Sequence, residues 1–350
     1  MSSKKPFLKV SAVDGERIRK ALLDYNLLDT EHKIVSLDGA LFLPLNREIH
    51  REQIETLLGP VSFQTGEMHF EPVSLGPKSL SDALKNHLSP AELELIPRAY
   101  DLIGDIAVLE IPDELLKHSK RIGLAFHEVH KNFSTVLAKR GAISGTTRVR
   151  EYQCLAGEDK TDTIHIEYGC RLAVDLSKAY FSPRLLEEHH RIAQLVKDNE
   201  FVVDMFCGVG PFPIHIARQR KAHIVAIDIN SEAIVLLNKS MRLNHLQGTI
   251  EPIVGDVKNY PKNKIADRVI MNHPSRAFDF IPEACRILKP SGVLHYYDFV
   301  GGEDPENTLT RKLAQLVEES GRCIETVNLV RRVRDSAPYE FQMVIDAVIE

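Results

Sequence analysis

From about residue 201 onward, apolar positions alternate between short strand-like runs and one-sided helical runs. Strands are expected at residues 201–206, 224–229, 251–254, 267–271 and 292–297, and helices at 212–219, 231–243, 278–288 and 308–319. A helix at 185–196 precedes them, and strand-like runs at 324–330 and 340–348 follow. Such alternation predicts an α/β fold with a doubly wound sheet, whose ligands bind at the carboxyl ends of the parallel strands.

The first 75 residues follow an α+β pattern instead. A strand over residues 7–11 precedes a helix whose apolar face runs through Leu27. Two strand-like runs then flank Asp38-Gly39, a strong hairpin signal. Residues 59–80 are rich in Gly, Pro and Ser and are expected to form a linker.

Between these regions lies a second α+β segment with strand-like runs at 107–111, 164–168 and 170–174. The sequence therefore predicts three domains. They are a small N-terminal module with its linker (1–75), a middle domain (76–178) and a doubly wound domain (179–350).

Composition restricts the class of protein. Of 350 residues, 43% are hydrophobic and 27% charged, which is ordinary for a soluble protein. No apolar run approaches the roughly 18 residues of a membrane span, and no signal segment is visible at the N-terminus. The five cysteines form no Cys-x-x-Cys pair, so we expect no disulfide framework, no metal site and a cytoplasmic location.

The net charge of −5 conceals a local excess of positive charge. Residues 117–150 contain eight Lys or Arg side chains and one acid, Glu128, giving +7. A positive field on an acidic body suits a polyanionic partner such as a nucleic acid, although a solvated basic face is also compatible with it.

A glycine loop follows the first strand of the doubly wound region. Gly208 and Gly210 are weak evidence alone, because Gly-x-Gly turns are common. Asp228 ends the next strand, where a carboxylate can accept ribose hydroxyls, and Asp256 ends the third, near an adenine amino group. The third glycine of a dinucleotide loop is missing, and Asp204 would repel phosphates but suit an ammonium group. This set favours S-adenosylmethionine over NAD; a tight turn without a ligand is the alternative.

The fourth strand ends in Asn272-His273-Pro274. Many methyltransferases place a polar residue followed by proline here, beside the planar nitrogen that receives the methyl group. Taken alone, the tripeptide fits an ordinary turn better.

Several longer motifs together are more specific. They are Ala179-Tyr180-Phe181-Ser182-Pro183-Arg184-Leu185, Glu188-His189, Asp204-Met205-Phe206, Gly208-Val209-Gly210-Pro211-Phe212 and His295-Tyr296-Tyr297. With them the chain resembles the archaeal and eukaryotic tRNA (guanine(37)-N1)-methyltransferases, whose usual Asn-Leu-Pro is Asn272-His273-Pro274 here. The resemblance implies a Rossmann-like class I methyltransferase domain preceded by two smaller domains. It also implies S-adenosyl-L-methionine as cofactor and methylation of N1 of the guanine 3′ of the anticodon.

The resemblance also implies residue roles. Glu188 matches the general base, Arg148 the group that stabilises guanine O6, and Asn272 the group at the guanine edge. Cofactor-binding positions are His189, Asp204, Gly208, Gly210, Asp228, Ile229, Asp256, Val257 and Asn272; substrate-binding positions are Tyr180, Pro274, Arg140, Arg184 and Arg334. By residue type alone, Arg148 could equally contact a phosphate, Tyr180 could be a core side chain, and His189 could be structural.

The implied partner is tRNA, held at its elbow by the N-terminal module and at its anticodon stem-loop by the other two domains of a monomer. Two related activities stay open: aminocarboxypropyl transfer in the wybutosine pathway, and methylation of a tricyclic guanine at the same site. A non-catalytic tRNA-binding protein is the alternative from another class. The intact set of cofactor and catalytic motifs argues against that alternative.

Overall fold

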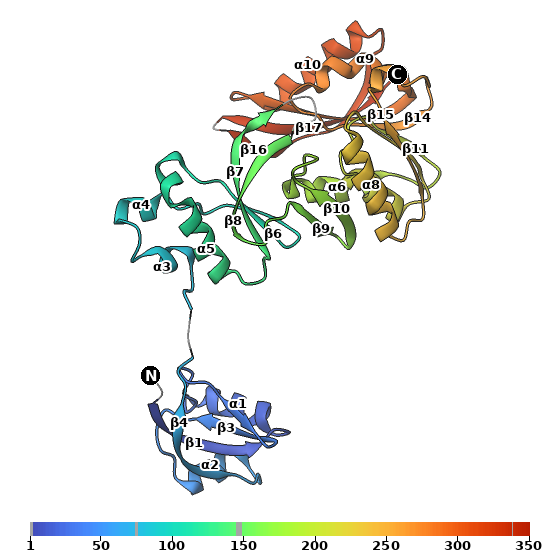
Figure 1. Ribbon diagram of the computed structural model, residues 1–350. Coiled ribbons are helices and arrows are strands. Elements are labelled where there is room, and N and C mark those ends of the chain that lie inside the picture. Colours follow the sequence, from blue (N-terminus) through green and yellow to red (C-terminus); the bar gives the residue numbers. More distant parts are fainter. Residues whose placement is uncertain (1–2, 74–75, 145–148, 338) are drawn as a thin grey trace. The chain divides into compact units, whose positions relative to one another are not determined.

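The computed structural model describes residues 3–73, 76–144, 149–337 and 339–350. The chain divides into two compact units, Met1–Lys78 and Ser79–Glu350, and each is described here by itself (Figure 1). The three-domain division of the sequence stays a prediction. No helix among the described residues is long and apolar enough to cross a membrane.

The first unit is a four-stranded sheet with two helices. Its elements are β1 (Ser3–Ser11), α1 (Gly15–Asp24), β2 (Val35–Leu37), β3 (Ala40–Pro44), α2 (Arg51–Leu58) and β4 (Gln64–Phe70), with strand order β2-β3-β1-β4. The predicted hairpin is confirmed, because Asp38 and Gly39 both have positive φ, 47° and 73°. The expectation of a linker from residue 59 was wrong, since β4 pairs with β1. Gly66 leaves room there for the ring of Phe7, which a larger residue would crowd.

The second unit begins with a mixed sheet of order β5-β6-β7-β8. Its elements are α3 (Leu80–Leu84), α4 (Pro90–Glu94), β5 (Asp101–Ile103), β6 (Ile106–Leu109), η1 (Asp113–His118), α5 (Ser119–Val129), β7 (Thr135–Ser144) and β8 (Val149–Gly157). Helix α5 packs on β8, where Gly123 meets Leu155. The described basic residues of the stretch 117–150 therefore lie in η1, α5, β7 and β8, except Lys131, which lies between α5 and β7.

A hairpin follows, β9 (Asp162–Glu167) and β10 (Cys170–Asp175). Leu172 and Val174 of β10 are buried in the same core as helices of the doubly wound sheet. The Ser240 hydroxyl of one such helix also accepts the backbone N–H of Ala173, at 2.9 Å. The hairpin thus packs as an extra layer on that sheet.

The predicted doubly wound sheet is confirmed. Its elements are η2 (Pro183–Leu185), α6 (Leu186–Leu195), β11 (Phe201–Asp204), α7 (Pro211–Gln219), β12 (His223–Asp228), α8 (Ser231–Leu243), β13 (Thr249–Val254), η3 (Val257–Asn259), β14 (Ala266–Met271), η4 (Ala277–Phe280), α9 (Ile281–Ile287), β15 (Leu288–Gly301), α10 (Pro305–Glu319), β16 (Ile324–Ala337) and β17 (Glu340–Ile349). Strand order is β13-β12-β11-β14-β15-β17-β16, parallel up to β15, with β17 antiparallel.

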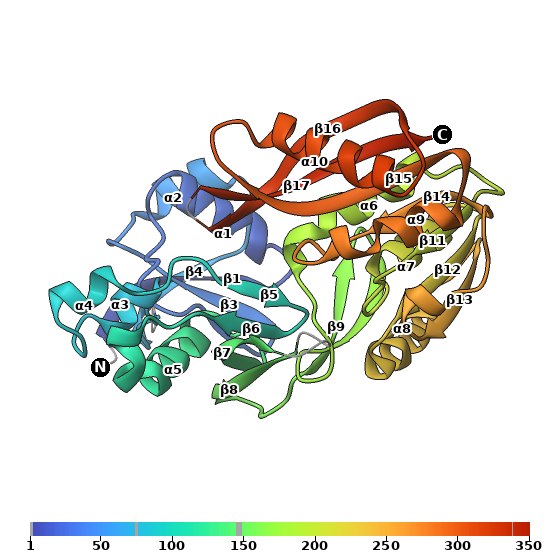
Figure 2. The same ribbon diagram turned by 90° about the horizontal axis from the view of Figure 1, so that it is seen from above.

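Side-chain alternation along the strands builds a core on each face. Val202 and Ile224 face one core with α6, α7 and α8. Val203 and Val225 face the other with α9 and α10 (Figure 2). The direction in which successive strands are added to the sheet reverses between β11 and β14, and ligands bind at such a point in doubly wound sheets.

The run Arg331–Arg334, expected between the last two strands, lies inside β16. β16 pairs with β17 as far as Ala337–Glu340, so the connection is shorter and the strands longer than the sequence indicated. Because β16 is the edge strand of the sheet, it carries these charged side chains without burying all of them.

Candidate active site

A cavity of about 740 Å³ opens at the carboxyl ends of β11, β12, β13 and β14. Ten of the predicted site residues line it: Tyr180, His189, Gly208, Asp228, Ile229, Asp256, Val257, Asn272, Pro274 and Arg334. Their convergence on one cavity, from Tyr180 to Arg334 along the chain, is the strongest sign that the site is functional.

Five other predicted residues do not line the cavity: Glu188, Asp204, Gly210, Arg140 and Arg184. Arg148, the sixth, lies outside the described residues. Its predicted role at guanine O6 therefore stays a prediction.

The cofactor edge of the cavity is organised by Asp228. Its two carboxylate oxygens accept the backbone N–H groups of Gly208 and Asn230, at 2.7 and 2.8 Å. Gly208 has φ of 53°, and a Cβ there would meet only the Tyr180 carbonyl within 4 Å. The loop thus leaves open space next to the backbone of Gly208, and Asp228 lines this space.

Asp204 lies behind this edge. It is fully buried, and its Oδ2 has no hydrogen-bond partner among the described residues. Burial raises the pKa of Asp204 to about 8; the N–H of Phe206 opposes the shift and the charge of Asp228 adds to it. Asp204 Oδ1 accepts the backbone N–H of Phe206, so this side chain supports the loop from behind. Its contact with an ammonium group stays a prediction.

Gly210 has a packing role. It caps the N-terminus of α7 with φ of 85°, in the left-handed region that favours glycine. A Cβ at this position would collide with Leu237 of α8. The second glycine of the loop therefore brings α7 and α8 together, and only Gly208 faces the cavity.

Asn272 belongs to a short chain of hydrogen bonds. Arg334 Nε donates to Gln342 Oε1 at 2.7 Å, and Gln342 Nε2 donates to Asn272 Oδ1 at 3.4 Å. Gln342, 1% exposed on β17, also lines the cavity. Sequence reasoning missed it because a lone Gln in a strand carries no motif; only the pairing of β15 with β17 brings it to this site.

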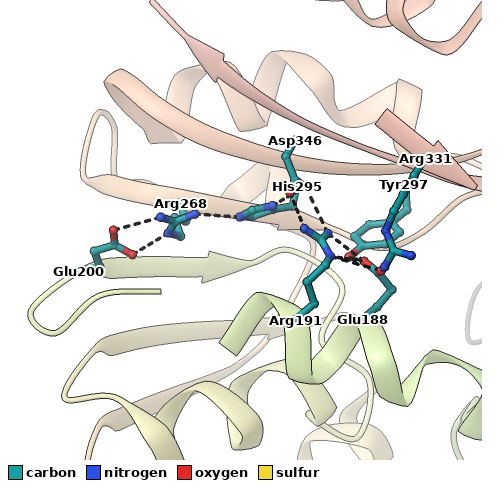
Figure 3. A network of polar contacts seen from close by, with 8 residues as sticks. All are labelled: Glu188, Arg191, Glu200, Arg268, His295, Tyr297, Arg331 and Asp346. Carbon is teal, nitrogen blue, oxygen red and sulfur yellow. Dashed lines mark hydrogen bonds and ion pairs between the residues drawn. The ribbon is translucent and has the colours of Figure 1, made fainter. Parts of the chain in front are cut away.

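Glu188 sits in a separate buried cluster beside the cavity (Figure 3). Its carboxylate, 1% exposed, accepts Arg191 Nη2 at 2.8 Å and the Tyr297 hydroxyl at 2.7 Å. Arg331 of β16 also donates to it. The predicted general base is therefore held by two guanidinium groups and a phenol.

This cluster extends through the sheet (Figure 3). Arg191 Nη1 donates to Asp346, whose other oxygen pairs with His295 Nδ1 at 2.7 Å. Although burial alone would raise it, His295 and Arg191 hold the pKa of Asp346 well below its usual range. Arg268 continues the chain from His295 to Glu200. Arg191 is thus fixed from behind by an ionised partner.

The two predicted phosphate ligands outside the cavity have protein partners. Arg140 donates to Gln153 on the neighbouring strand. Arg184 donates to Asp101 of β5 at 2.7 Å, so it also joins the first sheet of this unit to η2. Both remain partly exposed, which leaves N–H groups for a phosphate.

His189 both lines the cavity and contacts a buried acid. Its Nδ1 is 2.7 Å from Glu167 Oε2. Burial lowers the pKa of His189, although Glu167 opposes the shift.

Comparison with known proteins agrees with this geometry. Residues 163–326 match the TRM5/TYW2 methyltransferase domain, residues 80–161 the TYW2 N-terminal domain, and residues 8–53 the tRNA methyltransferase 5 N-terminal domain. The chain is 37% identical to tRNA (guanine(37)-N(1))-methyltransferase Trm5b of Pyrococcus abyssi, over 97% of each chain.

Two further relatives bear on the substrate. A solved complex of aTrm5 with tRNALeu is 36% identical, with a TM-score of 0.76 over 98% of this chain and 99% of that one. The tRNA(Phe) (4-demethylwyosine(37)-C(7)) aminocarboxypropyltransferase of Pyrococcus horikoshii is 32% identical, over 76% of this chain and 95% of its own.

Proposed function

This chain belongs to the tRNA (guanine(37)-N1)-methyltransferase family, because it is 37% identical to a member over 97% of each chain. From this premise we propose its reaction. It is an enzyme that uses S-adenosyl-L-methionine to methylate N1 of guanine 37 in tRNA. The observation that carries the assignment is the single cavity that joins the Asp228 edge to Asn272 and Pro274.

The residues present fit the cofactor. Asp228 keeps free lone pairs for the ribose hydroxyls, because each of its oxygens accepts a single N–H from the described part of the chain. Ile229 and Val257 offer apolar surface beside Asp256 for an adenine ring. When bound, S-adenosylmethionine supplies an electrophilic methyl group.

Guanine N1 carries a proton at neutral pH, so a base must remove it. We assign this role to Glu188, which must first release one of its partners. Arg191 is held by Asp346 and Tyr297 is fully buried, whereas Arg331 is 40% exposed on the edge strand. Arg331 is therefore the partner that can move to a tRNA phosphate, which leaves Glu188 Oε1 with one long hydrogen bond, 3.3 Å from Arg191 Nε.

The remaining roles concern contacts with the guanine ring of the substrate. Asn272, oriented by Gln342, offers its amide to the guanine edge. Pro274 and Tyr180 line the same cavity and supply faces against which the ring can pack. Negative charge that develops on O6 needs a cation that stays protonated, for which Arg148 is our candidate.

The decisive experiment is methylation of unmodified tRNA transcripts in vitro, with the product nucleoside identified. One added methyl group on N1 of guanine 37 is expected. An aminocarboxypropyl adduct, or a methyl group only on a tricyclic guanine, would replace this assignment. Absence of any heat on titration with S-adenosylmethionine would favour a non-catalytic tRNA-binding protein.

We further propose that the unit Met1–Lys78 contacts the tRNA elbow and that the rest of a cytoplasmic monomer holds the anticodon stem-loop. A tethered contact raises the effective concentration of the second. Deleting residues 1–78 should therefore lower kcat/KM for full-length tRNA more than for a minimal stem-loop. Equal loss on both substrates would make the unit a folding support instead.

A further inference from the structure

A buried cluster of metal-type ligands lies behind the cofactor cavity. Glu167 ends β9, His189 lies in α6 and His215 lies in α7. One ligand atom from each is within 4.8 Å of the other two. Their side chains are 1%, 2% and 0% exposed. Of these three side chains only His189, a predicted cofactor-binding residue, lines the cavity; Glu167 and His215 do not.

Polar atoms in this cluster have long or poorly aligned contacts. Among the described residues, neither ring nitrogen of His215 meets the geometry of a hydrogen bond, and neither does Glu167 Oε1, which lies 3.5 Å from His165 Nε2. Glu167 Oε2 is 3.3 Å from His215 Nε2 without being aligned for a hydrogen bond, and 2.7 Å from His189 Nδ1. Unpaired polar atoms in an interior are costly, so an additional bound group would account for them.

The distances between the ligand atoms suit a tetrahedrally coordinated metal ion. Ligand atoms about 2.0–2.3 Å from a zinc ion stand roughly 3.3–3.8 Å apart. The contact between Glu167 and His215 already has this length, and that to His189 must open by about half an ångström. The buried thiol of Cys170 interacts with the His215 ring but does not belong to the group of mutually close ligand atoms, so a water molecule would complete the tetrahedron.

We propose that Glu167, His189 and His215 bind one divalent transition-metal ion of the zinc class, with a water molecule as the fourth ligand. Any proton on a coordinating ring nitrogen goes to solvent, and the carboxylate balances one of the two positive charges of the ion. The ion would tie the β9–β10 hairpin to α6 and α7. It would also fix the ring of His189, next to Glu188 in the chain.

The test uses the full chain after removal of metals with a chelator, and Co²⁺ as the probe. One equivalent of Co²⁺ should give the visible absorption of a tetrahedral site, and Zn²⁺ should displace it. The matched pair is His215→Gln against His223→Gln, because His223 is exposed and bonded to Thr249.

Loss of an outer-shell partner of a metal ligand costs about 10–100-fold in affinity. Loss of the ligand His215 should therefore weaken Co²⁺ binding by at least about 100-fold, while His223→Gln binds as wild type. Zn²⁺ should raise the Tm of wild type and His223→Gln but not of His215→Gln. A wild-type protein without stoichiometric Co²⁺ absorption would overturn the proposal, whether or not the variants fold. Equal binding by His215→Gln and wild type would overturn it too, leaving a hydrogen-bonded cluster.

Discussion

The cofactor edge and the Glu188 cluster belong to neighbouring elements of one unit but are built in opposite ways. At the edge, Asp228 is held by backbone N–H groups of Gly208 and Asn230, in loops directly after strands. In the cluster, Glu188 is held by side chains from α6, β15 and β16. One site leaves space for a ligand, whereas the other has already filled its hydrogen-bonding capacity.

This difference separates binding from chemistry. Because backbone N–H groups hold Asp228 in place before the cofactor binds, cofactor affinity should depend on one or two side chains. A carboxylate saturated by partners is a poor base until one partner leaves, so the rate should depend on the whole cluster. Four substitutions test this division, taken from the largest expected effect to the smallest.

The largest effect is expected for Glu188→Gln. If Glu188 is the base, single-turnover methyl transfer should slow about 10²–10⁴-fold, and raising the pH toward the guanine N1 pKa should partly restore it. Affinity for S-adenosylmethionine, measured by calorimetry, should change little. Glu187→Gln is the control, because that exposed neighbour contacts only Tyr168 among the described residues.

Removing one member of a buried ion pair also destabilises a fold, so the thermal stability of Glu188→Gln must be followed in parallel. Slow transfer without recovery at high pH would assign Glu188 a structural role. Rates within about threefold of wild type would exclude it as general base, since a lost base costs at least about 100-fold.

Asp228→Ala tests the cofactor edge. A hydrogen bond to a charged group is worth ~1.5–3 kcal/mol, so S-adenosylmethionine should bind roughly 10–150-fold more weakly. The rate at saturating cofactor should fall far less than in Glu188→Gln. Asp198→Ala is matched, because Asp198 also accepts a backbone N–H, that of Lys221, away from the cavity. Unchanged calorimetric affinity would remove Asp228 from the cofactor site.

Asp204→Asn tests the support behind that edge. The pKa of Asp204 rises from 3.8 to about 8 on folding, so the folded state keeps a proton that the unfolded chain loses. The contribution of Asp204 to the free energy of unfolding is therefore largest below about pH 4 and falls toward pH 8, by about 1.4 kcal/mol per pH unit. The Asn variant should gain about 2.7 kcal/mol relative to wild type between pH 5 and 7 in denaturant unfolding. A pH-independent difference would show that Asp204 is ionised.

The smallest effect is expected for Arg331→Met. Without this cation Glu188 keeps Arg191 and Tyr297 as partners, while tRNA loses one candidate phosphate contact, so the measurement is the profile of tRNA affinity against salt concentration. Affinity for tRNA should fall and become less salt-dependent if Arg331 meets a phosphate. Arg332→Met is the control, because Arg332 pairs with Asp335 and stacks on Phe341. Identical profiles for the two variants would remove Arg331 from the mechanism.

The sequence alone determined the sheet and most of the cavity. Alternating strands and helices fix a parallel sheet, and motifs that follow its strands must meet at one edge, since parallel strands point the same way. That is why Gly208, Asp228, Asp256 and Asn272 could be placed together from their positions in the chain.

Tertiary structure decided which of these groups face a ligand and which contact other groups of the protein. Asp204 and Gly210 lie in the same loop region as Gly208, yet one is buried behind it and the other packs on Leu237. The hydrogen-bond partners of Glu188 lie up to 143 positions away in the sequence, and Gln342 donates to Asn272 from 70 positions away. Strand β4 likewise formed from a segment with a linker's composition because β1 offered an unpaired edge. Burial and pairing depend on what the rest of the chain brings alongside, and no local pattern contains that information.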